Sequence, residues 1–219
     1  MSGIVSKMTT KHIVLALVAL LLVIGVTTVF FGSSNNEEPL DTNQSNIMTN
    51  NSAVVEFQGV EYHMPVPEQE VPGTDYTAVF KEVVPVGESL ESWTTLITSQ
   101  QLTPLPDGPV ISAEGYAGNL LQMHGSQGAQ VLETLVLSNP EWESVGIDTT
   151  NPPFLLVYVY NVPESDDAEL SIAVIRNTAD KNVEAVIYSK RFLRTDINEF
   201  LQSEEYMNTR IAVVTLDSF

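Results

Sequence analysis

The most regular pattern along the chain is an uninterrupted apolar run near the N-terminus. Residues Ile13–Phe31 carry no charge, and 14 of these 19 positions are Ile, Leu, Val or Phe. A helix of about 20 apolar residues spans the hydrocarbon core of a bilayer. The run therefore predicts one transmembrane anchor over residues 12–31, preceded by a short tail over residues 1–11.

Charges on either side of the anchor predict its orientation. Lys7 and Lys11 precede it, and acidic residues follow it from Glu37 onward. Because basic flanks stay on the cytoplasmic side, we expect a single-pass protein of the inner (cell) membrane with a cytoplasmic N-terminus and a periplasmic or extracellular C-terminal domain. A cleaved signal peptide is the alternative. It needs a shorter apolar core and small residues at its cleavage site, whereas this run ends in Phe30-Phe31.

The chain changes character after the anchor. Residues 32–53 are polar and rich in Asn and Ser, which predicts a flexible linker. Random-coil scaling gives this linker a reach of about 25 Å. Residues 54–219 mix apolar and polar positions and are long enough to form one exported domain with its own core.

Period-two alternation and continuous apolar runs predict the strands of this domain. Apolar side chains recur at even positions in residues 75–84, which is typical of a half-buried strand. Residues 154–160 are apolar throughout, which indicates a strand covered on both faces. The polar turn at residues 178–181 predicts a hairpin. Further strands are expected over residues 54–62, 129–137, 169–177, 182–192 and 211–216, and a Pro-rich loop over residues 64–73.

Apolar spacing near 3.6 residues predicts the helices. Leu90, Trp93 and Ile97 fall on one helical face, with Ser89 as a possible N-cap, so we expect Trp93 in the core rather than at a ligand. The three expected helices cover residues 87–102, residues 112–124 and a segment that Thr195 caps. Short connections between neighbouring strands then predict an α+β fold, a mainly antiparallel sheet with packed helices.

Two stretches resemble a group of uncharacterised bacterial membrane-anchored exported proteins with a PsbP-like α/β/α sandwich domain. One is Gly87-Glu-Ser-Leu-Glu-Ser-Trp93-Thr-Thr-Leu-Ile-Thr, and the other is the segment Asn182–Phe192, which ends in Ser-Lys-Arg-Phe. The resemblance extends from about Val54 to Phe219 and implies a sheet with helices on both faces. Known members of this fold act by binding, among them a photosystem subunit and a factor that binds a small GTPase. No functional residue is carried over, since fold alone does not establish function.

Composition narrows the range of partners. Two of the nine basic residues and none of the 28 acidic residues precede the anchor, so the part beyond it carries a net charge of −21. Such a surface repels phosphate, which argues against nucleic acid and anionic lipid as partners of the domain. The charge serves solubility, or alternatively a basic partner or cation capture. The absence of cysteine excludes disulfides and thiol chemistry.

Each motif with candidate chemistry has a simpler structural interpretation. His63 in a Pro-flanked loop and His124 at a helix end are the domain's histidines, and a cationic cap explains His124. The glycines of residues 125–128 follow a helix instead of opening one, so we expect a turn and not a phosphate site. Residues 164–169 lack the pattern of a calcium loop. Glu88, Glu91 and Glu114 are expected on helix surfaces. We therefore predict no catalytic residue, no metal site and no cofactor.

Trp142 is the residue that we expect to take part in binding, because it lies in a polar loop sequence, Asn-Pro-Glu-Trp-Glu. The first functional hypothesis is a non-catalytic, membrane-tethered binding or accessory domain with a protein partner at the membrane. The alternative is an exported hydrolase that uses carboxylates or a histidine, and a third is a calcium-responsive envelope protein. A flat face around Trp142 would favour the first, whereas a concave pocket with convergent Glu and His would favour the second.

The anchor can be tested by topology. A reporter enzyme that works only after export, fused after Phe219, should be active, because the positive flank holds the N-terminus in the cytoplasm. Intact-mass measurement of the membrane-extracted protein should find the N-terminal segment still attached. A mature N-terminus near Ser33 would instead demonstrate cleavage.

Overall fold

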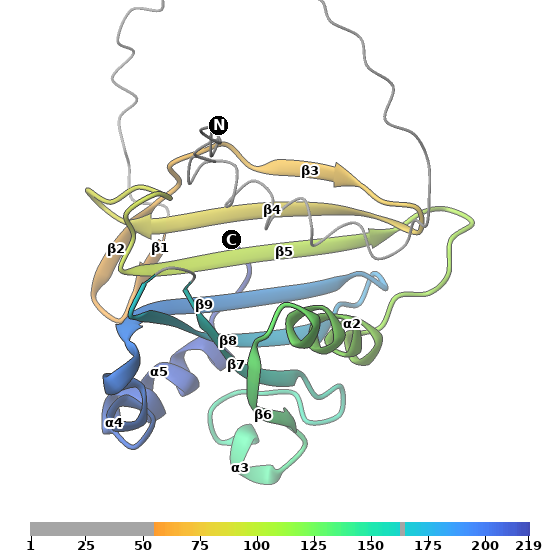
Figure 1. The fold of residues 1–219 in the computed structure, drawn as a ribbon. Helices are drawn as coiled ribbons and strands as arrows, with labels where there is room; N and C mark the ends of the chain where they lie inside the picture. Colours follow the sequence, from red (N-terminus) through yellow and green to blue (C-terminus); the bar gives the residue numbers. More distant parts are fainter. Residues whose placement is uncertain (1–54, 163–164) are drawn as a thin grey trace, which may run out of the picture.

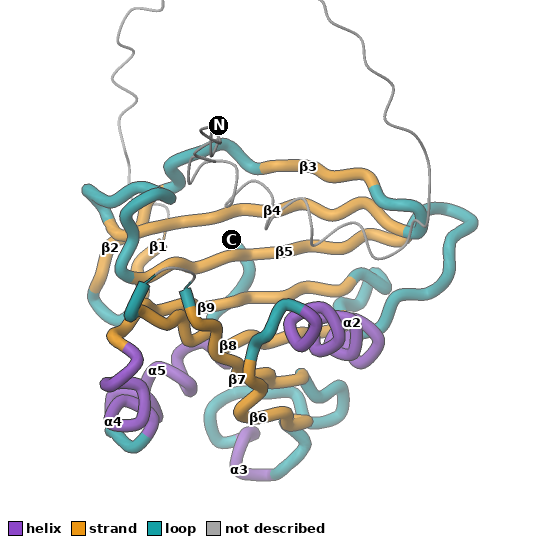
Figure 2. The backbone as a smooth tube through the Cα atoms, in the orientation of Figure 1, coloured by secondary structure: helices purple, strands orange, loops and turns teal. Residues whose placement is uncertain are grey.

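One antiparallel sheet dominates the computed structural model, which describes residues 55–162 and 165–219. The predicted tail, anchor and linker, at residues 1–11, 12–31 and 32–53, lie outside the described residues. Within the described part, no helix combines the length and apolarity that crossing a bilayer requires. Figure 2 shows the strands following one another across a single twisted sheet.

The sheet consists of two groups of strands that follow one another along the chain. The first group is β1 (Val55–Phe57), β2 (Val60–His63), β3 (Gln69–Pro72), β4 (Tyr76–Pro85) and β5 (Thr95–Pro104). The second is β6 (Gln130–Val136), β7 (Phe154–Asn161), β8 (Asp167–Asn177) and β9 (Val183–Leu193). The order in space is β1-β2-β4-β5-β9-β8-β7-β6, with β3 also paired to β4. Pairing of β5 with β9 therefore joins the two groups (Figure 1).

Helices cover both faces of this sheet. Helix α2 (Ala113–Ser126) packs on one face against β7, β8 and β9. On the other face lie α4 (Ile197–Leu201) and α5 (Glu204–Thr215), which follow β9 and the short 3₁₀ helix η1 (Arg194–Asp196). The four-residue helix α3 (Pro140–Glu143) follows β6. The fold is thus α+β with a mainly antiparallel sheet, as the sequence predicts.

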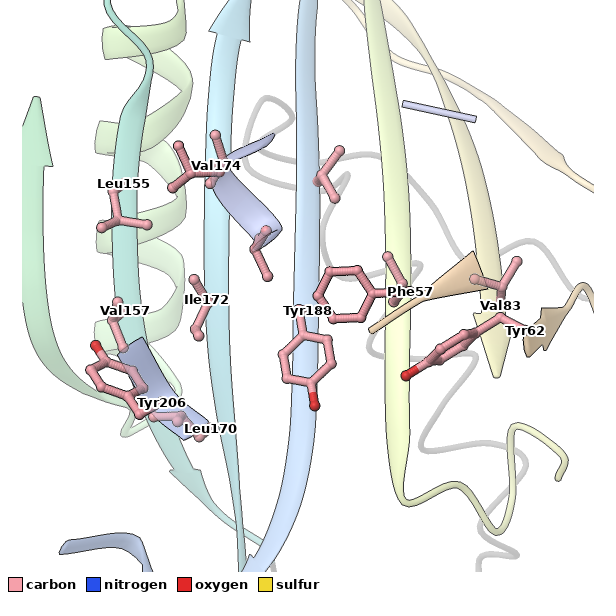
Figure 3. Close-up of a cluster of buried hydrophobic side chains, with 14 of the residues drawn as sticks. Phe57, Tyr62, Val83, Leu155, Val157, Leu170, Ile172, Val174, Tyr188 and Tyr206 are labelled. Atoms are coloured by element: carbon pink, nitrogen blue, oxygen red, sulfur yellow. The ribbon is translucent and has the colours of Figure 1, made fainter. Parts of the chain in front are cut away.

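Alternating side chains divide the core into two clusters, one on each face of the sheet. On the α5 face, Leu155, Val157 and Ile172 are fully buried beneath Phe200, Tyr206 and Val213. Figure 3 shows the strand residues of this cluster projecting from one face, with α2 on the other side of the sheet. On the α2 face, Leu120 and Met123 cover Leu156, Ala173 and Ile175. Because both faces are covered, β7 and β8 are apolar on both faces, which confirms the prediction for residues 154–160.

The predicted helix over residues 87–102 is wrong, because β5 occupies its second half. Residues 94–98 include the β-branched residues Thr94, Thr95, Ile97 and Thr98, which favour strands. Ile97 and Leu102 are both buried, but on opposite faces of the sheet, so the apparent helical spacing is coincidental. Ser89 lies in the loop before β5 and caps no helix. This loop is held by Glu88, which accepts hydrogen bonds from the backbone N–H and hydroxyl of Thr94 at 2.7 and 2.8 Å.

The C-terminal segment also differs from its prediction. Residues 211–216 belong mostly to α5 and not to a strand. Ser203 caps this helix by accepting a hydrogen bond from the Tyr206 N–H at 3.1 Å, and Tyr206, Thr209 and Val213 form its buried face. Thr195 caps no helix, because its hydroxyl bonds to Asp196. The expected loop over residues 64–73 contains β3.

The paired substitutions Leu102→Ala and Leu90→Ala test the assignment of β5. Leu102 is 1% exposed in β5, so its truncation should lower the free energy of unfolding by about 2 to 5 kcal/mol. Leu90 lies partly exposed in the preceding loop, and its truncation should cost less than about 1 kcal/mol. Denaturant titration of the full-length protein in detergent measures both. A helix over residues 87–102 would give the reverse order, since Leu90 fits that helical face better.

Candidate functional site

A cavity of about 150 Å³ opens on the α2 face of the sheet, beside the C-terminal end of α2. We call it the sheet cleft. Its walls come from both groups of strands, from the end of α2 and from the loop before β5. The residues that line it are Phe80, Glu82, Trp93, Leu96, Thr98, Gln100, Met123, His124, Gln127, Tyr158, Tyr160, Glu169, Ser171, Ile187, Ser189 and Arg191.

Strand register places the polar residues of the sheet cleft on one face. Glu169 pairs with Arg191 across β8 and β9, and two residues further along Ser171 pairs with Ser189. On β7, Tyr160 pairs with Glu169, and Tyr158 pairs with Ser171. Glu82 pairs with Thr98 across β4 and β5. Because side chains two residues apart share a face, these polar groups continue the surface that α2 covers further along the same strands.

Aromatic rings form two walls of the sheet cleft. The His124 ring stacks on Tyr158 with centroids 4.1 Å apart and meets the edge of Tyr160 at 5.2 Å. On the opposite side, the Arg191 guanidinium lies over the Trp93 ring at 3.9 Å from its centroid. Such a cation–π contact contributes about 0.5 to 2 kcal/mol and fixes the direction of the Arg191 side chain.

His124 is the least satisfied polar group of this site. The side chain is 6% exposed, and neither Nδ1 nor Nε2 has a hydrogen-bond partner among the described residues. Burial lowers the pKa of His124 from 6.5 to about 4, since desolvation disfavours the charged imidazolium. The imidazole is therefore neutral at pH 7. This corrects the expectation of a cationic cap at the helix end, because desolvation outweighs the attraction of the helix dipole.

Two carboxylates share the sheet cleft with one guanidinium. Burial raises the pKa of Glu82 above its ordinary value, and the charge of Glu169 raises it further. Burial also raises the pKa of Glu169, while the charge of Arg191 and a hydrogen bond from Ser189 act in the opposite direction. Within residues 55–162 and 165–219, Arg191 forms no ion pair with either carboxylate. Burial therefore keeps both carboxyl groups less readily ionised than on an open surface.

Several hydroxyl and amide groups at the sheet cleft have partners within the chain, whereas the buried Arg191 Nε has none among the described residues. The Ser171 and Ser189 hydroxyls bond to each other at 2.8 Å. Tyr116 of α2 donates its hydroxyl proton to the Gln100 side-chain oxygen at 2.5 Å. These bonds satisfy buried groups, so they fix the shape of the floor. Both ring nitrogens of His124 stay without a hydrogen-bond partner among the described residues.

Only some of the residues singled out in the sequence lie at this site. His124 and Trp93 line the sheet cleft. Trp93 is buried, as expected, and it also lines the cavity, although it belongs to neither apolar cluster. That it contacts no ligand stays a prediction. His63 is the buried last residue of β2 and not part of a loop. The acids Glu88 and Glu114 lie elsewhere, at the loop before β5 and in the first turn of α2.

Trp142 occupies α3, away from the sheet cleft. Its ring is partly buried against the α5-face cluster and lies 5.7 Å from the Arg210 guanidinium, which pairs with Glu133 at 2.6 Å. A role for Trp142 in binding stays a prediction. The turn expected at residues 125–128 is confirmed by Gly128, with φ of +83°. Asp167 accepts a hydrogen bond from Ser165 in the hairpin between β7 and β8, and residues 163–164 lie outside the described residues.

A second, more polar groove of about 470 Å³ lies between the α3–β7 loop and the C-terminus. Asp148, Arg176 and Asp217 are its charged residues. The Arg176 guanidinium donates to the carbonyl oxygens of Leu216, at 2.9 Å, and of Val214. These bonds satisfy the carbonyls at the end of α5, so they explain Arg176 structurally. Among the described residues, no group of three or more His, Asp or Glu side chains is placed to hold a metal ion.

The sequence reasoning missed Glu82, Glu169 and Arg191. A signal was present in the strand pattern. In β4 the even positions Tyr76, Ala78 and Phe80 face α2, and Glu82 breaks this series with a charge. On β8 and β9 the odd positions change from apolar to polar, at Ser171 and Glu169 on β8 and at Ser189 and Arg191 on β9. All three breaks lie on the α2 face, but Glu82 is level with Ala173 and not with Glu169, and β5 and β9 lie between their two strands.

The unsatisfied imidazole can be tested with His124→Phe. The phenyl ring retains the stack on Tyr158 and removes two buried polar atoms, so the free energy of unfolding should rise by about 1 kcal/mol at pH 7. The wild-type protein keeps its full stability above pH 6.5. It loses stability as the pH falls from 6.5 towards 4, because His124 is protonated in the unfolded chain before it is protonated in the folded protein. The advantage of the variant should therefore grow over that interval, as measured by denaturant titration at several pH values.

Tyr116→Phe on the same helix is the contrasting control. It also removes a polar atom from the buried side of α2, but it breaks a formed bond and leaves Gln100 without its donor. Stability should fall by about 1 to 3 kcal/mol. A loss of stability in His124→Phe, similar to that in Tyr116→Phe, would show that the imidazole nitrogens are satisfied in solution.

Comparison of the chain with family models, with curated proteins and with solved structures found no match. The resemblance to PsbP-like proteins therefore stays a prediction. The functional assignment depends on the residues of the sheet cleft themselves: two carboxylates, a guanidinium and a neutral imidazole between aromatic walls.

Proposed function

We propose that this chain is a membrane-tethered, non-catalytic binding domain that holds a small ligand or a side chain of a partner in the sheet cleft. The observation that supports this most directly is His124, a buried imidazole without hydrogen-bond partners on the wall of a cavity. An unsatisfied buried polar group costs about 1 to 3 kcal/mol. An occupant that bonds to it recovers that free energy, which is typical of a preformed binding site.

The proposed anchor and linker would place ligand binding close to the membrane. Residues 12–31 would hold the protein in the bilayer, and the linker would let the domain reach about 25 Å from it. The ligand or partner would then be met at the periplasmic or outer surface of the membrane. Helices on both faces of an antiparallel sheet agree with the proposed PsbP-like sandwich, whose known members act by binding.

A hydrolase is the second candidate, since Glu82, Glu169 and His124 all line the sheet cleft. Raised pKa values of the two glutamates suit a general acid. His124 fits catalysis poorly. With a pKa of about 4 it is a weak base, and among the described residues neither of its nitrogens bonds to a hydroxyl or carboxylate that would form a triad. Binding without catalysis therefore explains more of the site.

Ligand-induced stabilisation of the full-length protein tests the proposal. A panel of small metabolites and capped amino acids is screened by thermal melting in detergent. A ligand at about 100 times its dissociation constant should raise the melting temperature by about 5 to 10 °C. Gln127→Trp, at the mouth of the sheet cleft, should abolish the rise. Gln122→Trp, at an exposed position of α2, is the matched control and should preserve it.

Equal stabilisation of wild type and Gln127→Trp would place binding outside the sheet cleft and contradict the proposal. Mass spectrometry of the recovered ligand separates the two candidate functions. An unchanged mass supports binding. Cleavage that Glu82→Gln abolishes, while stabilisation persists, would support the hydrolase.

A further inference from the structure

We propose that the sheet cleft binds a small zwitterion of the α-amino-acid class, with the ligand carboxylate on Arg191 and the ligand ammonium on Glu169. This inference rests on the proposed binding function and specifies the chemistry of the occupant. A residue inside a polypeptide has neither group free on its backbone. The occupant is therefore a free amino acid and not an internal segment of a partner.

Strand register brings the two opposite charges within reach of one small molecule. Glu169 and Arg191 are direct cross-strand partners on β8 and β9, and both line the sheet cleft. Side chains paired in this way have Cβ atoms about 4.5 to 5.5 Å apart. The ammonium and carboxylate of an α-amino acid are attached to the same carbon atom, so one molecule can meet both side chains.

Glu169 and Arg191 do not neutralise each other through an ion pair. Among the described residues no salt bridge joins them, because the guanidinium lies over the Trp93 ring at 3.9 Å from its centroid. The buried Arg191 Nε has no hydrogen-bond partner in the part of the chain that the structure describes. Burial raises the pKa of Glu169, although the charge of Arg191 acts against this rise. A donor and a carboxyl group are thus held side by side without bonding to each other.

This arrangement favours a zwitterion over an ion of either sign. An anion that bonds to Arg191 would lie beside Glu169, and a cation that bonds to Glu169 would lie beside Arg191. Like charges so close in a partly desolvated space are unfavourable. A zwitterion presents the opposite charge to each side chain and adds no net charge. Its bonds to the guanidinium and the carboxylate are charge-assisted and therefore among the stronger hydrogen bonds.

His124 gives independent evidence that this part of the cleft receives an occupant. Its side chain is more than nine-tenths buried, lines the cavity, and has two unpartnered nitrogens among the described residues. The ring meets the edge of Tyr160, which is the cross-strand partner of Glu169 on β7. The unsatisfied imidazole therefore borders the same end of the cleft as the two charged groups.

The remaining walls and the volume suit a short apolar side chain. Leu96, Met123 and Ile187 supply aliphatic surface, and Tyr160 supplies an aromatic ring. A volume of about 150 Å³ corresponds to roughly five water molecules at about 30 Å³ each. A small amino acid such as L-valine is of this size.

The first test is a titration of full-length protein in detergent, followed by methionine-methyl NMR. L-Valine should shift the Met123 signal, which reports on the sheet cleft, and should leave exposed Met207 on α5 unchanged. Isovalerate lacks the ammonium and isobutylammonium lacks the carboxylate. Each should bind at least about tenfold more weakly than L-valine, because one charge-assisted contact is lost.

The carboxyl ¹³C signal of Glu169 provides a test that needs no ligand. The pKa of Glu169 should lie above its ordinary value in the free protein and should fall when L-valine binds, since the ammonium favours the ionised form. A pKa below the ordinary value in the free protein would show that Glu169 pairs with Arg191 in solution. That result would overturn the inference.

Glu169→Gln and Arg191→Gln should each weaken L-valine binding at least about tenfold. Glu82→Gln makes the same change elsewhere in the cavity, level with Ala173, and should alter binding less than about threefold. Normal binding by both of the first two variants, or an equal loss in Glu82→Gln, would contradict the inference. So would an analogue with one charge that binds as well as L-valine.

Failure of this inference can be distinguished from failure of the proposed function. If L-valine does not shift Met123 while another ligand still gives Gln127-dependent stabilisation, the proposed function survives and this inference fails. If L-valine stabilises wild type and Gln127→Trp equally without shifting Met123, binding lies outside the sheet cleft and both fail.

Discussion

Pairing of β5 with β9 is the interaction on which the rest of the structure depends. Residues 95–102 of β5 meet residues 183–190 of β9, across about 90 positions of sequence. Without this pairing, the two groups of strands would be separate sheets with open edges. It also creates the sheet cleft, because Glu82 and Trp93 come from the first group, whereas Glu169 and Arg191 come from the second. Fold and candidate site therefore form in the same step, which requires closure of a long loop.

The sequence predicts local elements well and this pairing poorly. Helix α2, β7 and the β8–β9 hairpin follow from apolar periodicity and turn residues close to them in the chain. Strand β5 does not, because Leu90, Trp93 and Ile97 match a helical face by coincidence. Its true partners, β4 and β9, supply the hydrogen bonds that decide the outcome. Helix α5 differs from its prediction for a local reason, since the apolar residues of 211–216 predict a strand, whereas the cap at Ser203 begins a helix that continues through them.

The candidate site could be predicted only in part. His124 and Trp93 were singled out from the sequence, but with structural roles. Glu82, Glu169 and Arg191 look like ordinary exposed residues of half-buried strands, and only the register brings them to one cavity. The visible signal is a change from apolar to polar positions on one face of several strands. Deciding that these changes lie along the walls of one cavity requires knowledge of which strands are neighbours.

The polar part of the α2 face is difficult to explain by stability alone. Apolar side chains at these positions would extend the α2-face cluster, and a longer α2 would cover them. The chain instead ends α2 at Ser126, turns at Gly128, and leaves carboxylates with raised pKa values beside a neutral imidazole. Each of these groups costs free energy in the empty protein. Buried polar groups without partners are concentrated where a protein contacts a ligand. A bound ligand of complementary charge offsets the free energy that these groups cost in the empty protein.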